Sequence, residues 1–200
     1  MSSIAILVLA AGKSSRMKTT KQLLKFNNKF LLDVVLEKSK KLCSDSIFCV
    51  LGANSEKIKK NITTKNVHFI INKNYDKGLS TSIVEGVRFI ESKHKNLTGI
   101  LILLADQPKI SSQYLRDLIQ LFTIHSKKIV ASKYNNSIGV PAIFPSSYFS
   151  ELKCLKGDLG AKKLLKKEIN SIIFSNIDTN FVDLDTPEDL HNYKTKHNNC

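Results

Sequence analysis

The chain has 200 residues, of which 42% are hydrophobic and 24% are charged. This length and composition suit one domain with a substantial core over residues 1–200, and they exclude intrinsic disorder and collagen-like repetition. The 31 basic residues exceed the 17 acidic ones and give a formal net charge of +14, but only three of the basic residues are arginines. Nucleic-acid recognition favours arginines in a stripe with aromatic residues between them, whereas the lysines here are scattered. We therefore expect a lysine-rich surface that attracts anionic ligands, and no nucleic-acid partner.

The cysteines and apolar runs indicate a cytoplasmic protein without a membrane partner. The four cysteines have neither CxxC nor zinc-ligand spacing, which predicts free thiols. No apolar run reaches the roughly 18 residues that a membrane-spanning helix needs. The apolar run at residues 4–11 lacks the basic residues that precede the core of a signal peptide.

Short apolar runs alternate with amphipathic segments from the N-terminus to about residue 124. The runs are continuous and mostly leucine or β-branched, which is typical of strands buried on both faces of a parallel sheet. They lie at residues 4–9, 47–51, 67–71 and 100–104. Between or after them, residues 31–42, 80–90 and 113–124 repeat apolar side chains at helical spacing. Strands that alternate with helices predict right-handed βαβ crossovers and a three-layer α/β domain with a mainly parallel central sheet.

The remaining third of the chain has a less regular pattern. We expect strands at residues 129–132, 138–144, 172–174 and 181–184, a basic helix at 161–167 and a last helix from Thr186. Pro141 indicates an edge or bulged position in its strand, because proline cannot donate to the ladder. Asp158 stands where it could cap the basic helix. Thr186, Pro187 and Asp189 form a start signal for the last helix.

The first predicted strand leads into the richest motif, Leu9-Ala10-Ala11-Gly12-Lys13-Ser14-Ser15-Arg16-Met17. Small residues let backbone N–H groups approach a ligand closely, and Lys13, Arg16 and Lys21 supply positive charge for phosphate oxygens. The motif is not a Walker A loop, because Leu7 stands where that loop needs its first glycine, and Gly12 alone does not make a GxGxxG fingerprint. The segment therefore predicts a phosphate-binding loop, with an ordinary strand-to-helix turn as the alternative.

Carboxylates follow two of the predicted strands. Asp106 follows the strand at 100–104, at the edge where open α/β sheets bind ligands, and Mg²⁺ takes carboxylate and phosphate oxygens. A turn-forming aspartate before Pro108 is the alternative role. Asp183 and Asp185 stand two apart on an extended segment and so point to the same side. We favour Asp185 as a second metal ligand, and support of the helix that starts at Pro187 is the alternative.

Six segments in order resemble the nucleotidyltransferases related to molybdenum-cofactor cytidylyltransferase and guanylyltransferase. They are the Leu9–Met17 motif with Lys21-Gln22, Gly78-Leu79-Ser80-Thr81-Ser82, Leu104-Ala105-Asp106-Gln107-Pro108, Gly139-Val140-Pro141, Gly157-Asp158-Leu159-Gly160-Ala161 and Asp183-Leu184-Asp185-Thr186-Pro187-Glu188-Asp189. The resemblance implies a Rossmann-like domain of the glycosyltransferase-A type. Ala11 resembles the cytidylyltransferase branch, since the guanylyltransferases carry two glycines at that point.

The resemblance also implies a reaction, a Mg²⁺-dependent transfer of CMP from CTP onto a phosphorylated acceptor such as molybdopterin, with release of pyrophosphate. It implies catalytic roles for Arg16, Lys21 and Asp106, and a metal site of Asp106 with Asp185. It implies nucleotide contacts from Leu9, Ala10, Ala11, Gly12, Lys13, Ser14, Asn54, Gly78, Ser80 and Ser82. A molybdoenzyme or its chaperone would be a protein partner.

Two positions depart from the family pattern, and two other functions fit the same motifs. Lys18 stands where the family has glycine. Lys162 stands where arginine is common, so the positive charge is kept there but the planar guanidinium group, with its paired donors, is lost.

The first alternative function is nucleotidyl transfer to a sugar or polyol phosphate. The second is a non-catalytic chaperone that binds molybdopterin, although such a protein need not retain Arg16, Lys21 and Asp106.

Overall fold

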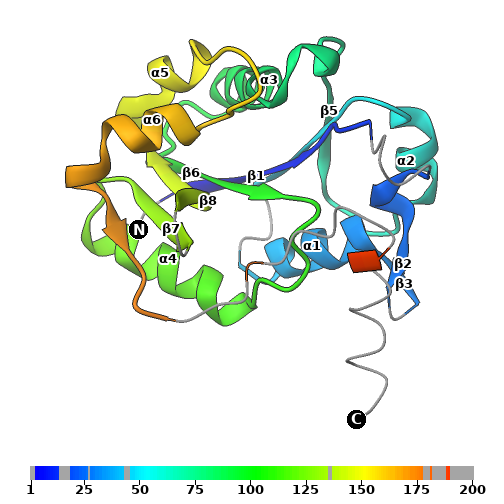
Figure 1. The fold of residues 1–200 in the computed structure, drawn as a ribbon, viewed down its shortest axis with the longest axis horizontal. Coiled ribbons are helices and arrows are strands. Elements are labelled where there is room, and N and C mark those ends of the chain that lie inside the picture. The colour runs from blue at the N-terminus through cyan, green and yellow to red at the C-terminus, as the bar shows by residue number, and fades with distance from the viewer. Residues whose placement is uncertain are drawn as a thin grey trace.

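A seven-stranded sheet divides the molecule into layers, with helices on both of its faces (Figure 1). The computed structural model describes residues 3–13, 19–26, 28–42, 46–134, 137–177, 181 and 188–189. Among the described strands of the sheet, β8 alone is antiparallel to its neighbours, and the other neighbouring strands are parallel. The strand order is β5 (His68–Ile71), β4 (Ile47–Leu51), β1 (Ile4–Ala10), β6 (Gly99–Leu104), β8 (Ser137–Pro145), β7 (Val130–Tyr134) and β9 (Ile173–Phe174). The expected α/β fold with a mainly parallel central sheet is therefore confirmed.

The helices cover the sheet in two groups. In Figure 1, α1 and α4 lie below the sheet and α3, α5 and α6 lie above it. Their bounds are α1 Leu31–Lys40, α2 Ser55–Asn61, α3 Leu79–Lys93, α4 Ser112–Ile124, α5 Phe149–Lys153 and α6 Lys162–Lys167. Single 3₁₀ turns occupy Lys21–Leu23, Tyr75–Lys77, Ser146–Tyr148 and Ile169–Ser171, and β2 (Lys25–Phe26) pairs with β3 (Lys29–Phe30) in a separate ribbon.

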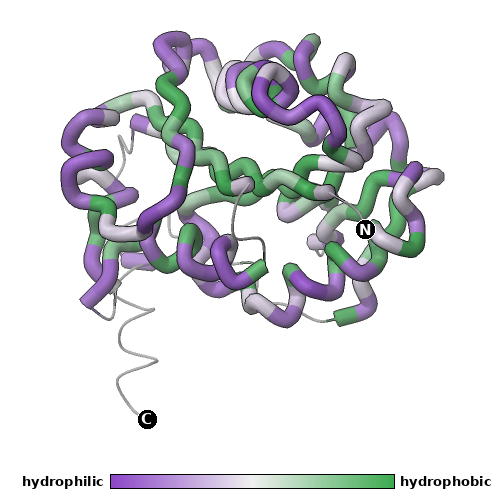
Figure 2. Tube along the Cα trace, turned by 180° about the vertical axis from the view of Figure 1, so that it is seen from behind, coloured by the Kyte–Doolittle hydropathy of each residue, from purple (hydrophilic) through white to green (hydrophobic). Residues whose placement is uncertain are grey.

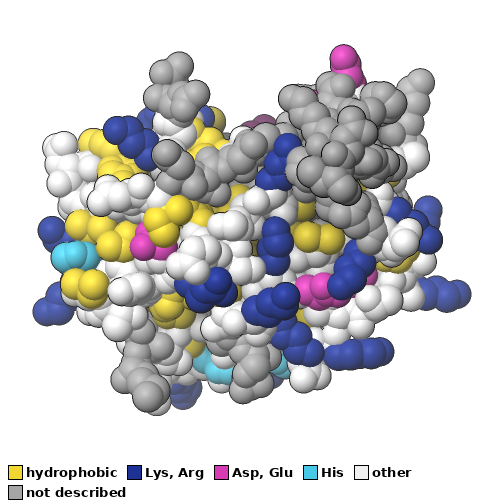
Figure 3. Space-filling model, turned by 90° about the horizontal axis from the view of Figure 1, so that it is seen from below, with side chains coloured by type: hydrophobic (Ala, Val, Ile, Leu, Met, Phe, Trp, Pro, Cys, Tyr) yellow, Lys and Arg dark blue, Asp and Glu magenta, His cyan; other side chains and the backbone are white. Residues whose placement is uncertain are grey.

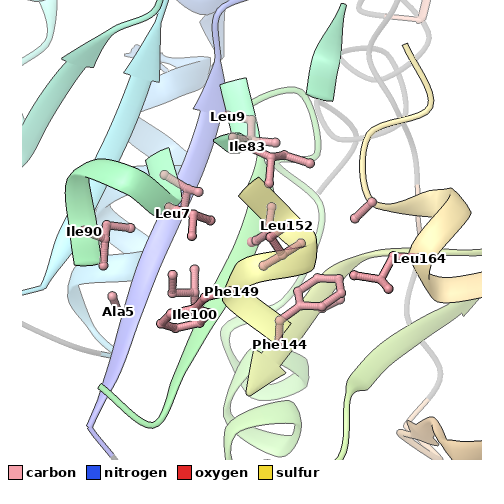
Figure 4. Close-up of a cluster of buried hydrophobic side chains, with 14 of the residues drawn as sticks. Ala5, Leu7, Leu9, Ile83, Ile90, Ile100, Phe144, Phe149, Leu152 and Leu164 are labelled. Carbon is pink, nitrogen blue, oxygen red and sulfur yellow. The ribbon is translucent and has the colours of Figure 1, made fainter. Parts of the chain in front are cut away.

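The core consists of two layers of apolar side chains, one on each face of the sheet. Successive residues of a strand point to opposite faces. Leu7 and Leu9 of β1 therefore pack in one cluster with α3, α5 and α6, whereas Ile6 and Val8 pack in the other with α1 and α4. Figure 4 shows part of the first cluster, and Figure 2 shows hydrophobic residues concentrated along the central strands. Burial on both faces explains why these strands are continuous apolar runs.

The sequence pattern located the strands better than the short helices. Each predicted strand and helix from residue 4 to residue 174 is present within a few residues of its expected bounds. The sequence pattern did not predict α2, because Ile58 is its one buried residue and the segment has little apolar periodicity. Of the predicted strand at 181–184 and the helix from Thr186, the described residues include only Phe181 and the helical pair Glu188 and Asp189.

Pro141 lies at a bulge inside the sheet. β8 has β6 on one side and β7 on the other, so it is not an edge strand. The register with β7 passes from Ala131 opposite Ala142 to Ser132 opposite Gly139. Two residues of β8, Val140 and Pro141, are thus left out of the ladder, and the missing N–H group of proline removes no sheet hydrogen bond.

Asp158 contacts α3 and not the helix that it was expected to cap. A Cβ on Gly78 would lie 2.5 Å from Asp158 Oδ1, and Ser80 N donates to Gly157 O at 3.1 Å. The loop before α6 therefore lies against the start of α3. The N-cap of α6 is Ala161, with no side-chain cap bond, so the capping prediction was wrong.

Among the described residues, the basic side chains and the cysteine thiols are found as the composition predicts. Basic side chains are spread across the face that Figure 3 shows. Cys49 is buried and Cys154 exposed, and both are free thiols. In the part of the chain that the structure describes, no helix is both long enough and apolar enough to span a bilayer.

Candidate active site

The carboxyl ends of β1 and β6 flank a cleft of about 420 Å³. These strands are neighbours, with Leu9 opposite Leu104. From β1 the chain crosses to β4 on one side, while β6 lies on the other side. A cleft between two such strands lies at a topological switch point, which is where open α/β sheets bind ligands.

The loop after β1 forms one wall of the cleft and is held by a buried glutamine. Gln22 Nε2 donates to Ala10 O at 2.7 Å and to Gly12 O at 3.2 Å. A Cβ added at Gly12 would meet nothing within 4 Å, so the loop faces open space at this residue. Because Gln22 follows Lys21 in the same 3₁₀ turn, the residue that fixes the loop also fixes the lysine beside it.

Lys21 and Asp106 form an ion pair inside the cleft. Lys21 Nζ lies 2.9 Å from Asp106 Oδ2, and the side chains are only 12% and 30% exposed. Asp106 follows β6, and its Oδ1 is buried without a hydrogen-bond partner among the described residues. Both residues were predicted from the sequence, and the fold brings them together across 85 positions of the chain.

The carboxylate of Asp106 is a suitable ligand for a divalent metal ion that also binds phosphates. Mg²⁺ typically takes one or two carboxylates together with substrate phosphates and waters. Asp106 Oδ1, which is buried without a hydrogen-bond partner among the described residues, could be the ligand that the protein provides in such a site. The described residues contain no cluster of three or more His, Cys, Asp or Glu that could hold a metal. The expected second ligand, Asp185, and its neighbour Asp183 lie outside the described residues.

The opposite wall of the cleft comes from the turn before α3 and contains residues that were not predicted as site residues. Tyr75 and Asp76 line it, and Asp158 reaches it from the loop before α6. Lys13 Nζ lies 5.6 Å from the centre of the Tyr75 ring, within the range of a cation–π contact. The positive end of the α3 dipole also lies at this wall, since Gly78 and Leu79 line the cleft at the start of α3. No short motif marks Tyr75 or Asp76, and a tyrosine or aspartate in a turn is common. Asp158 belongs to the Gly157–Ala161 motif, but the sequence indicated only a capping role for it.

Most of the predicted site residues that the structure describes line the cleft, and two of them do not. Asn54 is exposed at the start of α2 and does not line the cleft, and Ser80 is buried behind the cleft wall with its hydroxyl unpartnered among the described residues. Ser14 and Arg16 lie outside the described residues. The predicted site residues that do line the cleft are Leu9, Ala10, Ala11, Gly12, Lys13, Lys21, Gly78, Ser82 and Asp106.

A second cavity of about 260 Å³ adjoins the first, with Leu9, Leu79 and Leu104 in the lining of both. Its other lining residues include Tyr134 of β7 and Lys162 of α6. A Cβ on Gly139 would lie 3.1 Å from the Tyr134 ring, so the glycine lets that ring approach the backbone of β8 closely. The two cavities together provide adjacent spaces for two ligands.

Comparison with known families gives one match that covers most of the chain. The profile of the MobA-like NTP transferase domain matches residues 6–172. In solved structures, Rv0371c from Mycobacterium tuberculosis H37Rv is 26% identical, with a TM-score of 0.80 and coverage of 96% of each chain. The same protein in complex with manganese is 25% identical, with a TM-score of 0.79 and coverage of 96% of this chain and 97% of that one.

Three curated proteins, each named for a different function, are similar to this chain. The purine catabolism protein PucB of Bacillus subtilis is 35% identical over 117 residues, which is 57% of this chain and 55% of PucB. The bifunctional protein GlmU of Clostridium kluyveri is 30% identical over 171 residues, 82% of this chain and 36% of GlmU. The molybdenum cofactor cytidylyltransferase of Escherichia coli is 23% identical over 198 residues, 98% of both chains. The matches thus span about half of PucB and about a third of GlmU.

Proposed function

Because this chain belongs to the family of MobA-like NTP transferase domains, we propose that it transfers a nucleoside monophosphate onto a phosphorylated acceptor. We propose CTP as the donor and a molybdopterin-type cofactor as the acceptor. An oxygen of the acceptor phosphate attacks the α-phosphorus of CTP in line, a new P–O bond forms, and the bond to pyrophosphate breaks. The observation that carries this proposal is the Lys21–Asp106 pair inside the cleft that the loop after β1 borders.

The residues of the chain contribute binding, orientation and charge. The loop at residues 10–13 presents backbone N–H groups and Lys13 to the triphosphate, and Lys21 donates to phosphate oxygens whose negative charge grows in the transition state. Asp106 would hold the Mg²⁺, which supplies charge neutralisation on the transferred phosphoryl group and on pyrophosphate. Arg16 would add a bidentate contact to the triphosphate. Since little covalent chemistry is left to the protein, positioning accounts for most of the rate.

Two features support CTP and a cofactor acceptor. Ala11 stands in the turn against which the base would lie, where its methyl group narrows the space for a purine. The cytidylyltransferase of Escherichia coli aligns with this chain over nearly its whole length. The adjoining cavity, with Lys162 at its wall, would receive the acceptor and its phosphate.

A sugar or polyol phosphate is the second candidate acceptor. The observation that favours it is the match to GlmU, at 30% identity over 82% of this chain. The donor site and the transfer step would be the same, and only the occupant of the adjoining cavity would differ. A chaperone without catalysis is disfavoured because Lys21 and Asp106 remain paired in the cleft.

A nucleotide screen followed by a turnover assay tests the proposal. CTP, GTP, ATP and UTP are added with Mg²⁺, and the melting temperature is recorded. A nucleotide at about 100 times its dissociation constant stabilises by roughly 2.7 kcal/mol, which for a domain of this size raises the melting temperature by about 5–10 °C. Pyrophosphate release is then measured with molybdopterin and with sugar phosphates. The proposal would be contradicted if all four nucleotides raised the melting temperature equally. It would also be contradicted if neither molybdopterin nor any sugar phosphate supported pyrophosphate release.

A further inference from the structure

The turn after β6 carries Asp106, and its own backbone hydrogen bonds are long. Gln107 N donates to Leu104 O at 3.5 Å, and Ile110 N donates to Gln107 O at 3.4 Å. Amide hydrogen bonds in proteins are usually 2.7–3.2 Å long, so these two contribute little rigidity. Ala105 N donates to Leu9 O at 3.1 Å just before Asp106, so beyond that point contacts from other elements contribute most to the position of the turn.

A lysine of α1 supplies that support from below the sheet. Lys38 Nζ donates to the carbonyl oxygens of Pro108 and of Ile110, the latter at 2.9 Å. The two carbonyl groups stand two residues apart in the same turn, so one ammonium group binds the main chain at two points. On the other side of the turn, Gln107 Nε2 donates to the Tyr134 hydroxyl at 3.0 Å. The turn is thus clamped between α1 and β7.

Lys38 lies in partly buried, mostly apolar surroundings. The side chain is half-buried, and it borders a small gap together with Val35, Ile110 and Leu115. Burial lowers the pKa of Lys38 from its ordinary value, and the positive charge of Lys41 lowers the pKa further. An ammonium group in such a place is unfavourable unless acceptors surround it, and the two carbonyl groups are those acceptors. A lysine that served only solubility would extend into water.

We propose that Lys38 is a positioning residue for Asp106, because it ties the turn that carries the carboxylate to helix α1. This inference rests on the proposed function, since it concerns the metal and nucleotide chemistry of that same cleft. Lys38 itself does not line the cleft. Its effect passes through the main chain of residues 106–110, so its loss would let the carboxylate move away from the place where Lys21 Nζ meets it at 2.9 Å.

The test compares metal binding with nucleotide binding in four proteins. Lys38→Met keeps an apolar stem and removes the donor, and Lys38→Arg restores a charged donor. Lys40→Met is the matched control, because Lys40 lies on the same helix and its side chain has no polar partner among the described residues. Mn²⁺ affinity in the presence of CTP is measured by electron paramagnetic resonance, and CTP affinity without metal by calorimetry.

We expect Lys38→Met to weaken Mn²⁺ binding about 10- to 100-fold, the range seen when residues that orient a metal ligand are removed. CTP affinity without metal should stay within about twofold, Lys38→Arg should recover most of the loss, and Lys40→Met should match the wild type. A purely structural role would lower the melting temperature of Lys38→Met without this separation of metal from nucleotide affinity. Mn²⁺ affinity within about twofold of wild type in folded Lys38→Met would overturn the proposal.

Two further measurements keep the outcomes distinct. If Lys38→Met does not fold, Lys38→Gln, which keeps a neutral donor on a shorter side chain, is judged by the same affinities. Hydrogen–deuterium exchange of residues 106–111 without metal should be faster in the variant than in the wild type, and unchanged exchange would also overturn the proposal. If the wild type itself binds neither CTP nor Mn²⁺ with CTP, the proposed function fails and not the role of Lys38.

Discussion

Replacing Lys21 by methionine is the most direct test of the cleft chemistry. Lys21 Nζ lies 2.9 Å from Asp106 Oδ2. Two unit charges at that distance attract by about 6 kcal/mol at an effective dielectric constant of about 20, before the cost of desolvation is subtracted. The lysine is 12% exposed, so most of its hydration has already been lost, and an anionic phosphate can use its charge without much further reorganisation.

The expected loss is larger for catalysis than for folding. Removing one preorganised charge partner of a transition state typically costs about 2–4 kcal/mol, which corresponds to about 30- to 1000-fold in kcat/KM. Asp106 is 30% exposed, so water screens the carboxylate that loses its partner. We expect the free energy of unfolding to fall by about 1 kcal/mol, and the melting temperature by about 2–4 °C.

Pyrophosphate release from CTP, with the acceptor that supports turnover, measures the catalytic loss. Lys29→Met is the matched control, because Lys29 also forms an ion pair, with Glu37 at 2.6 Å, but its side chain is 54% exposed and does not line the cleft. The control should keep kcat/KM within about twofold. A loss below about threefold for Lys21→Met, or an equal loss for both variants, would refute the reasoning, since bulk charge would then explain nucleotide binding.

Four other substitutions have defined expected outcomes. Asp106→Asn should abolish metal-dependent pyrophosphate release while the circular dichroism spectrum stays that of the wild type, because one charge is lost with little change in volume; turnover within a few-fold of wild type would contradict the metal role. Gly78→Ala should lower the melting temperature by about 4–8 °C, because φ is +103° at this residue and the new Cβ would lie within 2.6 Å of another backbone segment. Ala11→Gly should raise kcat/KM for GTP relative to CTP by about 10- to 200-fold, and an unchanged ratio would place base selection elsewhere. Burial raises the pKa of Tyr114, so as pH rises the unfolded chain loses the phenol proton at a lower pH than the folded chain does. The free energy of unfolding should therefore fall as pH rises above about 10. Urea unfolding at several pH values should show a less steep fall in Tyr114→Phe.

The sequence alone located the elements and the residues that follow them. The strands β1, β4 and β6 are buried on both faces, so their residues are continuously apolar, and this pattern is visible without any tertiary contact. A loop of small residues and an aspartate that follow such strands must lie at the same edge of a parallel sheet. The loop at residues 10–13, Lys21 and Asp106 could therefore be predicted as site residues before the structure was known.

The tertiary structure decided which side chains meet. Neither apolar periodicity nor a motif predicts the strand order or the packing of loops on helices. The strand order and the loop packing bring Lys21 and Asp106, 85 positions apart, into contact. Asn54 follows a strand of the same sheet, yet it lies outside the cleft, because the start of α2 turns it toward water. Asp158 lies against α3 and not at the helix that follows it in sequence. Lys38 looked like one surface lysine among many, and only the packing of α1 under the Asp106 turn gives its ammonium group two carbonyl partners.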